Sequence, residues 1–265
     1  QMTFLFLGVL VALCNIALMF VPETGTAERA ASQRAAQDAM AHKMGGQGPV
    51  VKLLSFVGTT VLDPLLSFFR KNGMQIGIMI LAFIFLFKIG EAFMGKMSIV
   101  FYKEVGFSKS DIALYSKGLG WITTVTFTLI GGFFALRTGV VRALLISGIA
   151  MAGTNILFSV LAWVGPNELL FAFAVIVDDL AAAFATVAFV TFISLLVDRN
   201  YTATQYALLA SIGTLGRTLL ASSSGALVDG LGGDWGLFFI LTAIMVIPSL
   251  LLLWKLRHKL QNLAK

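Results

Sequence analysis

Long apolar runs separated by short polar segments make up most of this chain. The first run covers residues 1–21 and ends at Pro22, which matches the ~20 residues that a membrane-spanning helix needs. Six further runs of similar length predict spans over 74–101, 110–136, 141–164, 168–197, 201–228 and 235–255. The pattern therefore predicts an all-α membrane protein.

The segments between these runs carry helix-ending and helix-starting residues. Ser108 and Asp111 have the spacing of a capping box and predict a helix start. Turns are expected at Thr138-Gly139, Gly165-Pro166 and Arg199-Asn200, and helix ends at the glycine pairs Gly131-Gly132 and Gly232-Gly233.

A polar stretch divides the first run from the others. Residues 22–73 predict a solvated cytoplasmic linker with an interfacial amphipathic helix over about 49–71. Residues 74–256 then form a six-helix transmembrane bundle, and 257–265 a cytoplasmic tail. The chain opens inside an apolar run at Gln1, so we expect it to be a portion of a longer protein.

Composition supports a membrane location. Hydrophobic residues make up 58% of the chain and charged residues 12%, far below the roughly 25% charged residues of a soluble domain. The formal net charge is +6, but the basic residues lie at helix ends rather than in one stripe, which predicts membrane topology and not nucleic-acid binding.

The distribution of these basic residues predicts the orientation of the chain. If the linker is cytoplasmic, the opposite side holds only Lys103 and Lys109. An excess of Lys and Arg marks the cytoplasmic side of a membrane protein, so the C-terminus is expected in the cytoplasm. The thirteen basic residues on the linker side are Arg29, Arg34, Lys43, Lys52, Arg70, Lys71, Arg137, Arg142, Arg199, Lys255, Arg257, Lys259 and Lys265.

Few residues are suited to catalysis or metal binding. Cys14 is the only cysteine, and the two histidines, His42 and His258, lie in the linker and the basic tail. We therefore expect no disulfide within the chain, no metal, no cofactor, no catalytic residues and no enzyme activity.

The strongest chemical signal is a set of charges inside the apolar runs. A charge at the bilayer centre costs at least ~2.5–3.5 kcal/mol, so such residues usually face the bundle interior and mark a transport pathway. Lys88 and Glu91 are three apart and share a helix face. They form either a structural ion pair or a pair that opens when the carboxylate takes up a proton. Lys96 lies close enough to the interface to reach it.

Three further charged positions lie in later runs. Asp178 and Asp179 are adjacent, so they point about 100° apart on a helix. They either exchange a proton or pair structurally with Arg217 or Lys117. Arg217 lies among small residues that allow close helix contact, and its guanidinium suits a carboxylate of the protein or of a substrate.

Several motifs together resemble the AmpG-type muropeptide permeases of the major facilitator superfamily. The resemblance covers roughly residues 50–255, and its most specific part is Ala203–Leu209 with the downstream Gly216-Arg217. The other motifs are Phe87–Phe93, Lys117–Gly120, Arg142–Ile146 and Ala188–Val190.

The resemblance implies a major facilitator superfamily bundle with one preceding helix. Residues 1–21 would be the sixth helix, and the six later spans would form a C-terminal half that pairs with an N-terminal six-helix half. The whole would be a secondary transporter in the bacterial inner membrane that imports anhydro-muropeptides from periplasm to cytoplasm by proton symport. Such import serves peptidoglycan recycling and β-lactamase induction signalling.

The resemblance also implies roles for particular residues. Lys88, Lys117 and Arg217 would bind the carboxylates of a muropeptide, and Tyr115, Asn155 and Gln205 are weaker candidates for its hydroxyl and amide groups. Two alternatives stay open: a permease for another bulky anion such as a coenzyme A derivative, and a membrane sensor or scaffold without flux.

Overall fold

The computed structural model describes residues 58–198 and 202–263, together with 11–13, 15–16, 31, 35, 38–39, 51 and 55–56. Most of the predicted first span (1–21), most of the linker and the Arg199-Asn200 turn lie outside the described residues. The chain divides into two compact units, Gln1–Asp63 and Pro64–Lys265. In the first unit, a π-helical segment, η1, covers Gly58–Leu62.

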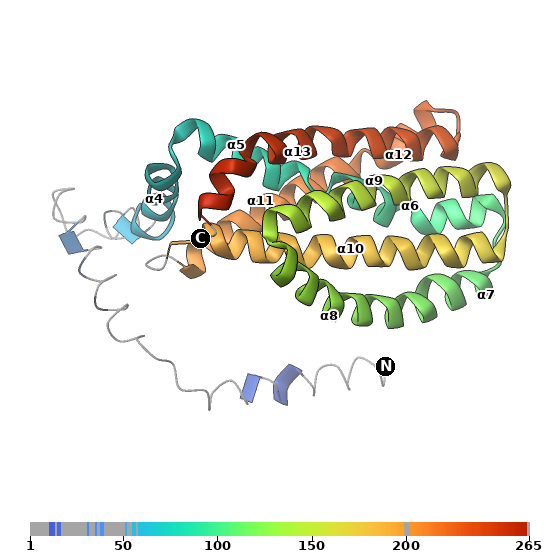
Figure 1. Ribbon diagram of the computed structural model, residues 1–265, viewed down its shortest axis with the longest axis horizontal. Helices are drawn as coiled ribbons and strands as arrows, with labels where there is room; N and C mark the ends of the chain where they lie inside the picture. Colours follow the sequence, from blue (N-terminus) through green and yellow to red (C-terminus); the bar gives the residue numbers. More distant parts are fainter. Residues whose placement is uncertain are drawn as a thin grey trace. The chain divides into compact units, whose positions relative to one another are not determined.

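The second unit is a bundle of helices that alternate in direction (Figure 1). α5 and α6 together form one long segment, and α8 follows the short helix α7 and the π-helical segment η2. The elements are α4 (Asp63–Asn72, which begins at the unit boundary), α5 (Met74–Leu86), α6 (Ile89–Val105), α7 (Lys109–Asp111), η2 (Ile112–Leu119), α8 (Gly120–Thr138), α9 (Val140–Val164), α10 (Glu168–Leu196), α11 (Thr202–Ser222), α12 (Ser224–Gly230) and α13 (Trp235–Leu263).

Five helical segments in the described part of the chain are long and apolar enough to cross a membrane. They are Met74–Val105, Lys109–Thr138, Val140–Val164, Glu168–Leu196 and Trp235–Leu260. α11 is not among them: it carries Gln205, Ser211 and Arg217, and it ends at Ser222. The described residues therefore form a multi-pass all-α bundle, as the apolar pattern predicts, whereas the span expected over 201–228 stays a prediction.

Most of the described turns follow the sequence signals. The Asp111 amide donates to the Ser108 hydroxyl over 3.2 Å, and the Ser108 amide donates to the Asp111 carboxylate over 2.9 Å, so the capping box is confirmed. Gly139 lies between α8 and α9 with φ +81°, a conformation that glycine adopts without a steric penalty.

The prediction that Gly131-Gly132 ends a helix is wrong. α8 continues through both glycines to Thr138. A Cβ on Gly131 would lie 2.9 Å from Cδ1 of Phe184 in α10, so this glycine serves close helix packing, which is a common use of small residues in membrane helices.

Two hydrophobic clusters fill the second unit, one toward each end of the long helices. The first contains the end of α5, the beginning of α9, the later part of α10 and the end of α13. The second contains α6, the end of α9, the beginning of α10 and the beginning of α13. Their buried members include Ile80, Phe83, Phe87, Leu144, Phe192 and Leu253 in the first, and Phe93, Phe101, Phe158, Phe171, Phe238 and Phe239 in the second.

Polar residues occupy the positions between the two clusters. On α9, Thr154 and Asn155 lie between Met151 of the first cluster and Phe158 of the second. Charged residues also separate the two clusters on the segment α5–α6, on α11 and on α10, where the second cluster comes first along the chain. We call this set the polar layer; it consists of Lys88, Glu91, Thr123, Thr154, Asn155, Asp178, Asp179 and Arg217.

Candidate functional site

The polar layer coincides with a break in the long segment α5–α6. The last regular backbone bond of α5 runs from the Phe87 amide to the Phe83 carbonyl (2.9 Å), and the next runs from the Ala92 amide to the Lys88 carbonyl (3.0 Å). Lys88 itself has φ −95° and ψ 17°. Helix ends leave backbone donors and acceptors without regular partners, so the break brings polar backbone groups to the level of the charged side chains.

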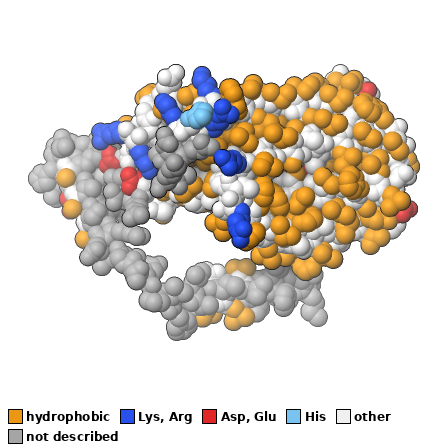
Figure 2. Space-filling model, viewed as in Figure 1, with side chains coloured by type: hydrophobic (Ala, Val, Ile, Leu, Met, Phe, Trp, Pro, Cys, Tyr) orange, Lys and Arg blue, Asp and Glu red, His pale blue; other side chains and the backbone are white. Residues whose placement is uncertain are grey.

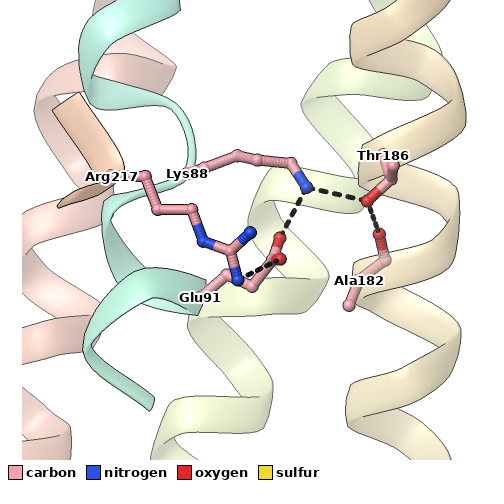
Figure 3. A network of polar contacts seen from close by, with 5 residues as sticks. All are labelled: Lys88, Glu91, Ala182, Thr186 and Arg217. Carbon is pink, nitrogen blue, oxygen red and sulfur yellow. Dashed lines mark hydrogen bonds and ion pairs between the residues drawn. The ribbon is translucent and has the colours of Figure 1, made fainter. Parts of the chain in front are cut away.

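Lys88 is bound by two side chains on different helices. Its Nζ lies 2.9 Å from Oε2 of Glu91 and donates to Oγ1 of Thr186 over 2.7 Å (Figure 3). The Thr186 hydroxyl donates in turn to the Ala182 carbonyl over 2.7 Å. An ammonium group only donates hydrogen bonds, so Thr186 must present its oxygen lone pair to Lys88, and its own proton is used within α10.

Thr186 is a site residue that the sequence did not reveal. A threonine in an apolar helix commonly bonds to its own backbone, as Thr191 does with the Val187 carbonyl over 2.8 Å. Nothing in the local sequence distinguishes the two threonines. The distinction depends on which one faces the helix break.

Glu91 lies between two cations. Its Oε1 is 3.6 Å from an Nη atom of Arg217, and its other oxygen faces Lys88. The side chains of Lys88 and Glu91 are 14% and 20% exposed, whereas that of Arg217 is 50% exposed. Two cations and one carboxylate leave the cluster with a formal charge of +1, and the excess charge lies on the more exposed partner.

Gly216 brings α11 into direct contact with the helix break. A Cβ on this residue would lie 2.2 Å from the carbonyl oxygen of Phe85, near the end of α5. Only a glycine allows that approach, which has the character of a Cα–H···O contact. Arg217 follows Gly216 in the chain, and its guanidinium passes Gly95, where a Cβ would lie 3.8 Å from Nη2. The glycine contact therefore sets the position from which Arg217 reaches Glu91.

Asp178 and Asp179 bind threonines on two other helices. Thr154 of α9 donates to Oδ1 of Asp178 over 2.8 Å, and Thr123 of α8 donates to Oδ2 of Asp179. The divergence expected of adjacent residues is thus observed. The structure pairs Arg217 with Glu91 rather than with either aspartate.

The weaker candidates divide between the polar layer and its surroundings. Asn155 lies in the layer, is 2% exposed, and its Nδ2 has no hydrogen-bond partner among the described residues. Gln205 instead links backbone groups: its Nε2 donates to the Pro64 carbonyl (2.8 Å) and its Oε1 accepts from the Asp198 amide (2.6 Å). That geometry gives Gln205 a structural role at one end of the bundle.

Three candidates lie apart from the helix break. The Tyr115 hydroxyl donates to Oε2 of Glu168 over 2.9 Å. Lys117 in η2 and Lys96 in α6 are exposed, and neither forms an ion pair within the described ranges. The structure therefore brings together Lys88, Glu91 and Arg217, and places Lys117 outside that cluster.

Interrupted helices with charged residues at the interruption are typical of the binding sites of membrane transporters. Comparison with known proteins gives homologues with consistent names. No family model matches the chain. Among curated proteins, it is 33% identical over 210 residues to a protein of Rickettsia conorii named putative transporter AmpG 4, a match that covers 79% of this chain and 49% of that protein.

Two further relatives carry related names. The anhydromuropeptide permease of Escherichia coli is 31% identical over 214 residues, or 80% of this chain and 42% of the permease. Putative transporter AmpG 1 of Rickettsia bellii is 30% identical over 205 residues, or 76% and 50%. The chain is a homologue of the AmpG-type permeases of the major facilitator superfamily, and these relatives are named as transporters or permeases rather than as enzymes. It spans about half the length of the curated relatives it matches.

The contact between Gly216 and Phe85 predicts a specific sensitivity in α11. Replacing Gly216 with Ala should lower the free energy of unfolding by about 1–3 kcal/mol, because a backbone carbonyl cannot rotate away as a side chain can. Gly153→Ala in α9 is the matched control, since nothing lies within 4 Å of its Cβ position. Thermal unfolding of the detergent-purified proteins measures both. Equal midpoints for the two variants would contradict the proposed contact.

Proposed function

We propose that this chain forms part of a secondary active transporter that imports anhydro-muropeptides from periplasm to cytoplasm by proton symport. Such import would serve peptidoglycan recycling and the signalling that induces β-lactamase. The relatives named as AmpG transporters and anhydromuropeptide permease support the substrate class. An N-terminal six-helix half would supply the other wall of the substrate cavity, as in transporters that alternate access between two halves.

The observation that carries this proposal is the charged cluster at the helix break. Lys88 and Arg217 share the single carboxylate of Glu91, so the described cluster has one cation in excess. A muropeptide carries several carboxylates, and a guanidinium can bind a carboxylate through two parallel hydrogen bonds. In our proposal Arg217, the more exposed cation, receives a substrate carboxylate first, and Lys88 stays with Glu91 and Thr186 until Glu91 takes up a proton.

Proton coupling would use the same cluster. When Glu91 takes up a proton, it loses the charge that holds Lys88 and Arg217, and both cations become available to an anionic substrate. When the proton leaves, Glu91 competes for the cations again and favours substrate release. Asp178 and Asp179 are further proton-exchanging candidates on α10, where each is bound to a threonine of a neighbouring helix.

The charge distribution of the second unit supports the proposed orientation. Lys and Arg side chains gather at one end of the described surface (Figure 2). Among described residues from Pro64 onward, that end has Arg70, Lys71, Arg137, Arg142, Lys255, Arg257 and Lys259 with Asp198, and the other end has Lys103 and Lys109 with Glu104, Asp111, Glu168, Asp229 and Asp234. By the positive-inside rule, the basic end, where α13 ends, would face the cytoplasm of a bacterial inner membrane.

The function is tested by uptake in cells that lack their own muropeptide permease, with expression from the complete reading frame. Lys88→Ala leaves Glu91 with Arg217 alone, and Glu91→Gln leaves two cations without a carboxylate. Both changes should reduce labelled anhydro-muropeptide uptake by about tenfold or more, because each leaves charged members of the cluster without the partner that compensates them. Glu91→Gln should also abolish uptake-linked alkalinisation of the medium.

Membrane abundance of each variant is the control for this experiment. Uptake per transporter equal to that of the parent in both variants would make the cluster structural and would overturn the proposed pathway. Competition with unlabelled coenzyme A derivatives distinguishes a permease for another bulky anion. No uptake by the parent at all would favour a sensor or scaffold.

Thr186 provides a finer test of the same site. Thr186→Val keeps the shape of the side chain but removes the oxygen that accepts from Lys88, so the muropeptide concentration at half-maximal uptake should change by about tenfold or more, because a hydrogen bond to a charged group contributes about 1.5–3 kcal/mol. Thr191→Val is the matched control, because in the described part of the chain its hydroxyl bonds to the Val187 carbonyl of the same helix. Identical uptake curves for the two variants would exclude a positioning role for Thr186.

A further inference from the structure

The basic end of the second unit contains two arginines that lie over outward-facing aromatic rings. The Arg137 guanidinium is 4.6 Å from the ring centroid of Phe133 at the end of α8, and the Arg257 guanidinium is 4.7 Å from that of Trp254 in α13. Both rings are more than half exposed, at 60% and 56%. In each pair an exposed ring thus carries a guanidinium group over its face, close to the end of a long apolar helix.

Helix packing places further cations beside these pairs. α9 and α13 run antiparallel: the Ser159 hydroxyl donates to the Gly236 carbonyl over 2.9 Å, and a Cβ on Gly148 would lie 2.6 Å from Leu250. The same register brings Arg142, near the start of α9, to the level of the α13 turn with Lys255 and Arg257. Arg137 is separated from Arg142 only by the turn at Gly139.

The two helix-end segments that carry these cations contain no acidic residue of their own, and Asp198 is the acidic residue at this end among those described from Pro64 onward. The stretches 133–145 and 250–260 contain no Asp or Glu, and the ion pairs among described residues in this unit are those of Glu91 alone. A general excess of Lys and Arg at one membrane face explains their presence. That general excess does not explain why two of the guanidinium groups lie over exposed aromatic rings.

The combination fits one ligand chemistry. An anionic phospholipid would place its phosphodiester at the level of the guanidinium groups, and its acyl chains could pack on exposed apolar side chains such as Trp254. One guanidinium group can donate to two phosphate oxygens at once, and its planar face stays free to stack on an aromatic ring. We propose that the end formed by Arg137, Arg142, Lys255 and Arg257 is a binding surface for the headgroups of anionic phospholipids.

The proposal is independent of muropeptide transport, because none of these residues belongs to the cluster at the helix break. It is tested by native mass spectrometry of the detergent-purified full chain, titrated with phosphatidylglycerol or with phosphatidylcholine of the same acyl chains. The parent should bind phosphatidylglycerol more tightly. The double variant R137Q/R257Q should lose roughly 25-fold in that affinity, since each cation near an anionic surface contributes about fivefold.

The opposite end of the bundle supplies the matched control. K103Q/K109Q removes two charges there and should leave phosphatidylglycerol binding unchanged. Should R137Q/R257Q fail to fold, R137K/R257K is the second variant. It keeps both charges but removes the planar guanidinium groups, so phosphatidylglycerol affinity should fall by about threefold or more. Equal binding of the two lipids, or equal loss in the control, would overturn the proposal. Inorganic phosphate and chloride are then compared as competitors at equal ionic strength. If phosphate displaces more lipid than chloride does, the surface binds free phosphate instead.

Discussion

The need to stabilise charges in the middle of an apolar bundle constrains the rest of this structure. Lys88 lies fourteen residues after Met74 and seventeen before Val105 in the segment α5–α6, where an unpaired ammonium would be unfavourable. Glu91 and Thr186 satisfy it. The neighbouring helices carry polar residues at the same level, so the apolar interior divides into two clusters that meet at the polar layer. A single continuous hydrophobic core would leave these groups without partners.

Glycines allow the helices around the polar layer to pack closely. Gly216 lies against the Phe85 carbonyl on the α11 side of the break, and Gly90 lies against Val246 of α13 and Asn155 of α9 on another side, where a Cβ would be 2.7 Å and 3.0 Å from them. Small residues are the usual means of bringing membrane helices together, because lipid gives no hydrophobic driving force for their association. Here they also bring side chains from separate helices within reach of one charged group.

The sequence predicts the helices better than it predicts the partners of the charged residues. Apolar run length and the turn residues near Gly139, Gly165 and Ser108 place most helix ends correctly, since these signals are local. The spacing of Lys88 and Glu91 likewise predicts their pairing on one helix. No proline marks the helix break after Leu86, and Gly131 continues a helix instead of ending it. The role of Thr186 depends on Lys88, which lies 98 residues away in the chain. Such contacts depend on how helices pack, which a single sequence does not specify.

α10 connects the polar layer to three parts of the bundle. Thr186 faces Lys88 at the break, Asp178 binds Thr154 of α9, and Asp179 binds Thr123 of α8. Asp179 and Thr186 are seven residues apart and share a helix face, whereas Asp178 points about 100° away. A displacement of α10 must therefore carry α8 and α9 with it or break their bonds to the carboxylates. Protonation weakens a carboxylate as an acceptor, so charge on Asp178 and Asp179 couples directly to how firmly α10 is held by its neighbours.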